Sequence, residues 1–141
     1  MKILFVCTGN TCRSPMAAAI ARQKLSQLGR DDIQIDSAGL AVFGPDPAAA
    51  NAVKAMAEMG IDLTDHQSRP LRFDEIPTTD WFVAMTPSHA AALSSAGVSP
   101  DRISVLNVSD PFGGSLEVYR QARDQICAAV DRFLKEVLPC D

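Results

Sequence analysis

The chain has 141 residues, of which 47% are hydrophobic and 21% charged, as is typical of a globular domain that buries a core without disulfide or metal support. Its net charge of −4 argues against the basic surface that nucleic acid or an anionic membrane would require. We therefore expect one domain over residues 1–141, monomeric, with no nucleic-acid or membrane partner.

The chain opens with a short apolar run, residues 3–6, directly before Cys7. Four residues are too few for a signal-peptide core or a membrane span. We interpret the run as a strand of a cytoplasmic protein. In that compartment the four cysteines of the sequence are reduced by default.

Strand patterns occur in four places, and helical patterns separate each from the next. The strands are expected at residues 2–6, 33–37, 81–85 and 103–106. This alternation indicates parallel βαβ units. We expect an α/β fold with a single open, twisted, four-stranded parallel sheet of Rossmann-like type and helices on both faces. Its ligand would lie beyond the carboxyl ends of the strands.

Prolines and capping residues mark the expected helix starts. Pro15, Asp46-Pro47 and Thr86-Pro87 each predict a start, and glycines at 29, 60 and 97 mark the corresponding ends. The last helix begins after Ser115. Its apolar positions keep helical spacing at Tyr119, Ala122, Ile126, Val130, Phe133 and Val137.

The segment from residue 1 to 16 reads MKILFVCTGNTCRSPM: a strand, a cysteine, a turn, an arginine and a helix start. The free N–H groups and dipole of a helix start favour both a thiolate at Cys7 and a bound phosphate. Arg13 adds a planar fork for two phosphate oxygens. Gly9 and Asn10 tolerate the left-handed dihedrals that the turn requires. These features predict a phosphate-binding loop around a nucleophile.

Ser14 and the four cysteines can be interpreted without a metal site. Ser14 can cap the helix, and its hydroxyl can donate to the Cys7 sulfur. Cys7 and Cys12 lack zinc-ligand spacing, so we expect no metal, and no other cofactor is implied. Cys127 is interpreted as a packing residue of the last helix, and Cys140 as an exposed bystander in the tail.

The segment Val6-Cys7-Thr8-Gly9-Asn10-Thr11-Cys12-Arg13-Ser14-Pro15 resembles the active-site loop of the low-molecular-weight protein tyrosine phosphatase family. Asp110-Pro111-Phe112 resembles its general-acid loop. The similarity spans nearly the whole chain and implies the phosphotyrosine phosphatase I fold. By local sequence alone, Asp110-Pro111 also fits a turn opener. A nucleophile at Cys7 needs an acid for the leaving group, and this need favours the catalytic role.

The chemistry expected of these residues is hydrolysis through a phosphocysteine intermediate. Cys7 attacks phosphorus, Asp110 serves as general acid and then as general base, and Arg13 binds the equatorial oxygens. The other expected phosphate-binding residues are Thr8, Gly9, Asn10, Thr11 and Cys12. The substrate would be a phosphorylated protein and the product inorganic phosphate.

The resemblance also implies supporting roles. Asn10, Ser37 and His66 would form a hydrogen-bonded scaffold for the loop, although His66 also fits a solvated loop histidine. Cys12 resembles a second cysteine of the family that can form a reversible disulfide with Cys7. The alternative for Cys12 is a buried wall residue.

Two departures from the family pattern concern the substrate. Thr11 stands where phosphotyrosine-specific members carry a large aliphatic residue, and Phe112-Gly113 stands where they carry a Tyr-Tyr pair. Both features resemble the bacterial protein arginine phosphatase branch. Phe112 and Phe43 can stack on a planar group, and Phe43 also fits a core residue displaced into a loop.

We therefore expect a phosphoarginine-preferring protein phosphatase, with a protein tyrosine phosphatase as the alternative. An arsenate reductase is less favoured, since it needs a resolving cysteine pair and no cysteine lies between Cys12 and Cys127. The intact Cys7, Arg13 and Asp110 argue against a catalytically inactive phosphopeptide-binding module.

Overall fold

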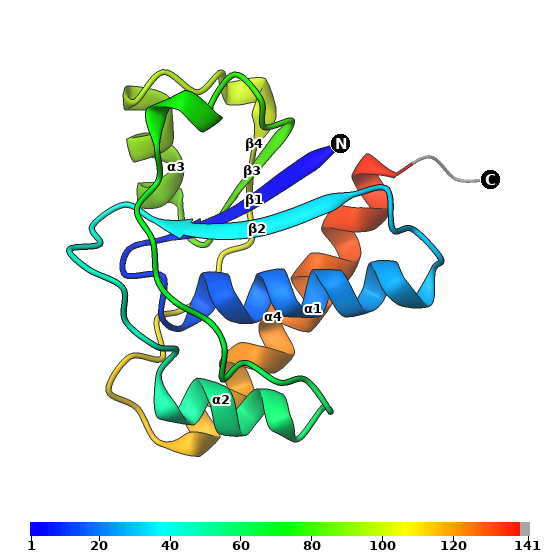
Figure 1. Ribbon diagram of the computed structural model, residues 1–141, viewed down its shortest axis with the longest axis vertical. Helices are drawn as coiled ribbons and strands as arrows, with labels where there is room; N and C mark the ends of the chain where they lie inside the picture. The colour runs from blue at the N-terminus through cyan, green and yellow to red at the C-terminus, as the bar shows by residue number, and fades with distance from the viewer. Residues whose placement is uncertain (139–141) are drawn as a thin grey trace.

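The computed structural model describes residues 1–138 and contains one parallel sheet flanked by helices (Figure 1). The strands are β1 (Lys2–Cys7), β2 (Gln34–Gly39), β3 (Trp81–Ala84) and β4 (Ile103–Val105). Their order is β2-β1-β3-β4, and every neighbouring pair is parallel. The four strands expected from the sequence are thus confirmed, with ends that differ by one or two residues.

The strand order places a topological switch at the end of β1. After β1 the chain builds outward to β2, and then returns to add β3 and β4 on the other side of β1. Connections that diverge in this way leave a crevice at the carboxyl end of the central strands, where ligands bind in open α/β sheets. Cys7 is the last residue of β1 and lies at this switch.

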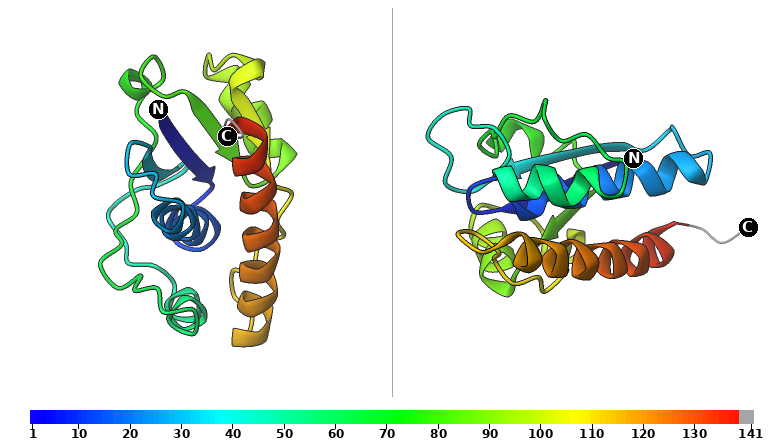
Figure 2. Two further views of the ribbon diagram at one scale, coloured as in Figure 1. Left: turned by 90° about the vertical axis from the view of Figure 1, so that its right-hand side faces the viewer. Right: turned by 90° about the horizontal axis from the view of Figure 1, so that it is seen from below.

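Helices cover both faces of the sheet, as the sequence predicts. α1 (Arg13–Gln27), α2 (Ala50–Ala57) and α4 (Leu116–Val137) lie on one side, and α3 (Pro87–Ser95) lies on the other (Figure 1). Viewed from below, α1 and α4 run side by side (Figure 2). Two short 3-10 helices, η1 (Phe73–Glu75) and η2 (Pro100–Arg102), are the other secondary-structure elements of the described residues.

Successive side chains of β1 are buried on opposite faces of the sheet. Ile3 and Phe5 pack with the α1 and α4 side, whereas Leu4 and Val6 pack with the α3 side, and all four are fully buried. Successive side chains of a strand point to opposite faces, so a strand covered on both faces is apolar throughout. The opening run of the sequence is therefore the centre of the core.

The expected starts of α1, α3 and α4 are correct to within two residues, and that of α2 is wrong. Thr86 caps α3 and Ser115 caps α4, each accepting a hydrogen bond from the backbone N–H three residues later. α2, however, begins at Ala50 rather than at Asp46-Pro47. The segment before it stays extended because Pro47 pairs with Gln67 in an isolated bridge.

α1 begins at Arg13, so Ser14 lies inside its first turn and the expectation that Ser14 caps this helix is wrong. On α4 the expected apolar face is buried from Tyr119 to Phe133, and Cys127 is half-buried against Met59. The expectation for Cys140 lies outside the described residues. Across residues 1–138, every helix is too short or too polar to cross a membrane.

Candidate active site

A pocket of about 230 Å³ opens at the carboxyl end of β1. It brings together nearly all the residues that the sequence predicts for the site. Its lining residues are Cys7, Thr8, Gly9, Asn10, Thr11, Cys12, Arg13, Asp110 and Phe112. Phe43 does not line this pocket, and its 99% exposure excludes the core alternative. A larger cleft of about 490 Å³ next to His66 has no cysteine in its lining, so it lacks the nucleophile.

Cys7 is held at the base of the pocket by two contacts to its sulfur. The Asn10 N–H donates to Sγ at 3.2 Å, and the Ser14 hydroxyl lies 2.9 Å from Sγ. In this position Ser14 can donate to the sulfur, as the sequence predicts. No side chain caps the start of α1, which leaves N–H groups of its first turn for an anion.

Asn10 is the centre of the loop scaffold. Its side-chain NH₂ donates to Ser14 Oγ at 2.7 Å and to Ser37 Oγ at 3.0 Å, and its Oδ1 accepts the Arg69 N–H at 3.0 Å. His66 Nε2 lies 2.7 Å from the Asn10 carbonyl oxygen, which can only accept, so this ring nitrogen carries the proton. The geometry thus brings together Asn10, Ser37 and His66 and disfavours a solvated His66.

A single residue of the phosphate-binding loop has a left-handed backbone conformation. Asn10 has φ of 57°, whereas Gly9 lies outside the left-handed region. The expectation of left-handed dihedrals is therefore correct for Asn10 and wrong for Gly9. Asparagine tolerates this region better than most residues, and the bonds to its side chain and carbonyl fix it there.

Arg13 and Asp110 face each other across the pocket. Arg13 is 5% exposed, and its Nη1 donates to the Val108 carbonyl at 3.0 Å. Its Nη2 lies 3.7 Å from Asp110 Oδ2. Asp110 is half exposed, and its other oxygen accepts the Phe112 N–H at 3.1 Å. The carboxyl group therefore stands at the mouth, where a leaving group would depart, and the guanidinium lies deeper.

The walls combine a polar and an aromatic side chain. Thr11 is half-buried in the lining, and Phe112 is 75% exposed at the rim. Cys12 is buried, with Sγ 3.2 Å from the Tyr119 hydroxyl. Burial raises the pKa of the Cys12 thiol, although hydrogen bonds with Tyr119 and Thr11 partly offset this. Cys12 is a wall residue here, and a disulfide with Cys7 stays a prediction.

Sequence reasoning missed His89. This buried residue of α3 places Nε2 2.8 Å from the hydroxyl of Thr8, a loop residue 81 positions earlier. Its position in the first turn of a helix that follows the carboxyl end of a strand places it near the site, but the contact with Thr8 has no local signal in the sequence.

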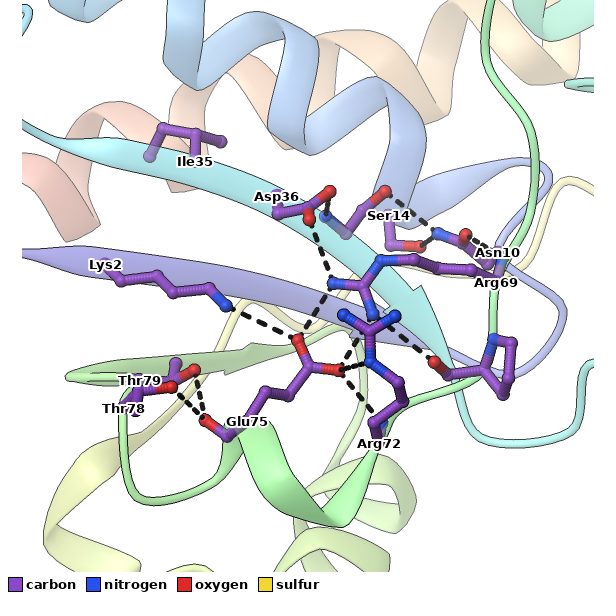
Figure 3. Close-up of polar contacts among 12 residues, drawn as sticks. Lys2, Asn10, Ser14, Ile35, Asp36, Arg69, Arg72, Glu75, Thr78 and Thr79 are labelled. Carbon is purple, nitrogen blue, oxygen red and sulfur yellow. Dashed lines mark hydrogen bonds and ion pairs between the residues drawn. The ribbon is translucent and has the colours of Figure 1, made fainter.

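Asp36 and Arg69 also fall where the family has supporting residues, but sequence reasoning missed Glu75 and the ion-pair network that joins all three behind the scaffold (Figure 3). The Arg69 guanidinium donates to both oxygens of Glu75, at 2.8 and 2.9 Å, and to Asp36 Oδ2 at 2.9 Å. Glu75 is 4% exposed. Its burial favours the neutral form, but hydrogen bonds from Arg69 and the Arg72 N–H outweigh burial and lower the pKa of Glu75 to about 2. The network fixes Arg69, whose N–H holds Asn10.

The sequence profile of the family described as low molecular weight phosphotyrosine protein phosphatase matches residues 2–139. The chain belongs to this family. It is accordingly a low-molecular-weight phosphatase, and the four-stranded fold expected from the resemblance is confirmed.

Three relatives of this phosphatase indicate the range of chemistry around it. The protein-arginine-phosphatase of Bacillus subtilis (strain 168) is 35% identical over 97% of each chain. A solved structure of the YwlE arginine phosphatase, a mutant with a phosphorylated active-site serine, is 35% identical with a TM-score of 0.89 over 97% of this chain and 95% of that one. An arsenate reductase of Shouchella clausii (strain KSM-K16) is 34% identical over 93% of each chain.

Proposed function

We propose that this phosphatase hydrolyses phosphoarginine in proteins through a phosphocysteine intermediate. The observation that carries the proposal is one pocket with Cys7 at its base, Arg13 and Asp110 facing each other at 3.7 Å, and Thr11 in its wall. The size of this pocket suits a side chain and its phosphoryl group rather than a large ligand.

In the first step the Cys7 thiolate attacks phosphorus, and the bond from phosphorus to the guanidine nitrogen breaks. The protonated Asp110 gives its proton to that nitrogen. In the second step Asp110, now a carboxylate, takes a proton from water, which attacks the phosphocysteine. Inorganic phosphate leaves, and Cys7 is again a thiolate. Arg13 and the loop N–H groups hold the equatorial oxygens throughout.

The preference for phosphoarginine rests on the walls. Thr11 offers a hydroxyl and little apolar surface, which suits a planar polar guanidinium better than a phenyl ring. Phe112 at the rim can stack on that plane. Proteins named as protein-arginine-phosphatases at 35% and 36% identity support this choice.

Replacement of Thr11 tests the preference. Thr11→Ile should depress phosphoarginine hydrolysis and preserve or raise phosphotyrosine hydrolysis, because the larger apolar wall favours the phenyl ring. A wall change of this kind supplies about 1–3 kcal/mol, so the ratio of the two kcat/KM values should shift by roughly 10- to 200-fold. Both substrates are assayed side by side, with the inactive Cys7→Ser variant as the background control. Equal losses on both would assign Thr11 a structural role, and a wild type that favours phosphotyrosine would overturn the proposal.

The arsenate reductase relative motivates a second assay. Reduction of arsenate through a cysteine cascade needs a pair of resolving thiols near Cys7. Among residues 1–138, the pocket contains Cys12 as its second cysteine, and Cys127 packs against Met59 from α4. We expect no arsenate-dependent consumption of a dithiol reductant. Turnover in that assay at a rate above phosphoarginine hydrolysis would favour the reductase.

We further propose that the protein acts as a cytoplasmic monomer on phosphorylated proteins. The proposed chemistry needs Cys7 as a free thiol, and a reducing compartment maintains free thiols. Light scattering on the purified protein measures the oligomeric state.

A further inference from the structure

The phosphate loop is held from two sides, and only one of them belongs to the scaffold described above. On the Asn10 side, contacts come from Ser14, Ser37, His66 and Arg69. On the Thr8 side, the one hydrogen bond that the Thr8 hydroxyl makes within residues 1–138 is to His89. The position of the Thr8 side chain, next to Cys7 in the sequence, thus depends on the imidazole ring of His89.

That ring is fixed at both nitrogens. Nε2 lies 2.8 Å from Thr8 Oγ1, and Nδ1 lies 3.1 Å from Oγ1 of Thr86, the capping residue of α3. His89 is 6% exposed and reaches the loop from the helix on the face opposite α1 (Figure 1). The start of α3 therefore anchors the loop through an imidazole.

The charged side chains that act on the His89 ring belong to the pocket. α3 has no other ionisable side chain, and the charged groups that act on His89 are Arg13 of α1 and Asp110 of the loop after β4. Burial and then Arg13 lower the pKa of His89, and Asp110 opposes them. The imidazole is thus neutral near pH 7 in the free protein. A phosphate dianion against Arg13 would offset the arginine charge and favour the imidazolium.

We propose that His89 is a positioning residue that holds the phosphate loop through Thr8 and takes up a proton when phosphate binds. The inference rests on the proposed function of the Cys7 pocket as a phosphate site. It adds to Cys7, Arg13 and Asp110 a fourth side chain, which acts through another residue and carries a charge only when the site is filled.

Substitution of His89 tests both parts with inorganic phosphate as the probe. His89→Ala removes the contact with Thr8, and we expect it to weaken phosphate binding and raise KM by roughly 3- to 10-fold, as for one hydrogen bond. His89→Gln can restore the contact through its amide but cannot titrate. Its phosphate affinity should match the wild type at pH 8. The ratio of wild-type to Gln affinity should then rise as the pH falls toward 5.5. This ratio cancels the ionisation of phosphate itself.

Two variants serve as controls. Ser94→Ala changes an exposed residue in the last turn of α3, which contacts neither Thr86 nor His89, and should leave the affinity unchanged. Thr8→Val should reproduce the loss seen in His89→Ala, and the double variant should lose no more than either single one. If His89→Ala folds poorly, Thr8→Val tests the contact by itself, because it removes the other partner of the same hydrogen bond.

The outcomes separate this inference from the function. Normal phosphate affinity in both Thr8→Val and His89→Ala would overturn the positioning role, and a wild-type to Gln ratio that is flat from pH 8 to 5.5 would overturn the proton uptake. A wild type that binds phosphate without hydrolysing phosphoarginine or phosphotyrosine would instead contradict the proposed function. An upfield-to-downfield titration of the His89 ring in NMR spectra, shifted to higher pH by phosphate, would support the inference directly.

Discussion

The Asp110 carboxyl group has a position that suits proton transfer better than binding. It is half exposed at the mouth, 3.7 Å from Arg13, while the deeper arginine lies where the proposed mechanism binds the phosphate oxygens. Asp110→Asn should therefore lower kcat by about 10²- to 10⁴-fold with a smaller change in KM. It should also remove the alkaline limb of the pH profile, because the first step needs a protonated carboxyl group.

The matched control for Asp110 is Asp46→Asn, an exposed aspartate that does not line the pocket. Its pH profile should equal that of the wild type. If Asp110→Asn kept the alkaline limb, the acid would be another group, and the two steps proposed above would need a different proton donor.

The aromatic ring of Phe133 packs α4 against two strands of the sheet. The Phe133 ring meets Phe5 of β1 edge-on at 6.5 Å and Trp81 of β3 edge-on at 5.7 Å between centroids. Phe133→Ala leaves a cavity between helix and sheet, and we expect a loss of roughly 3–5 kcal/mol in the free energy of unfolding. Urea denaturation measures the change. Phe133→Leu, which fills most of the volume, should cost less, and equal stability of all three proteins would contradict the packing role.

The elements that the sequence predicts correctly are those with a local signal. Apolar runs gave the four strands, and Thr86 and Ser115 gave two helix starts through their own side chains. The start of α2 was wrong because Asp46-Pro47 has a local helix signal that tertiary contacts override. The Asp46 N–H donates to Ser68 Oγ, and the Ala49 N–H donates to the Thr11 carbonyl.

The residues of the site likewise differ in whether the sequence carries a local signal for them. Cys7 and Arg13 lie in one contiguous loop, and Asp110 follows from the chemical need for an acid, so these residues could be predicted. His89 and Glu75 could not, because the role of His89 depends on Thr8, 81 residues away, and that of Glu75 on the burial of its own charge beside Arg69. Burial of a charged side chain has no local pattern in a sequence.

Glu75 joins segments that lie far apart in the chain. Its buried carboxylate binds Arg69 through both oxygens and lies 3.5 Å from Lys2 Nζ on β1, and Arg69 also binds Asp36 on β2 (Figure 3). The pKa of Glu75 is about 2 in the folded protein against an ordinary 4.5. A pKa lower in the folded state means that folding favours the carboxylate. The stabilisation is therefore fully present above about pH 4.5 and is lost as the pH falls toward 2.

Glu75→Gln should consequently destabilise the protein at pH 7 by about 3 kcal/mol, since the pKa difference corresponds to this amount and Arg69 loses its main buried partner. The difference from wild type should shrink as the pH falls from 5 to 3, where the wild-type carboxylate also loses part of its advantage. Urea denaturation at each pH measures both effects. Asp74→Asn, an adjacent residue whose side chain is 85% exposed, should change stability by only a few tenths of a kcal/mol. A loss in Glu75→Gln that stayed constant from pH 7 to 3 would mean that the lost stability comes from packing and not from the charge of Glu75.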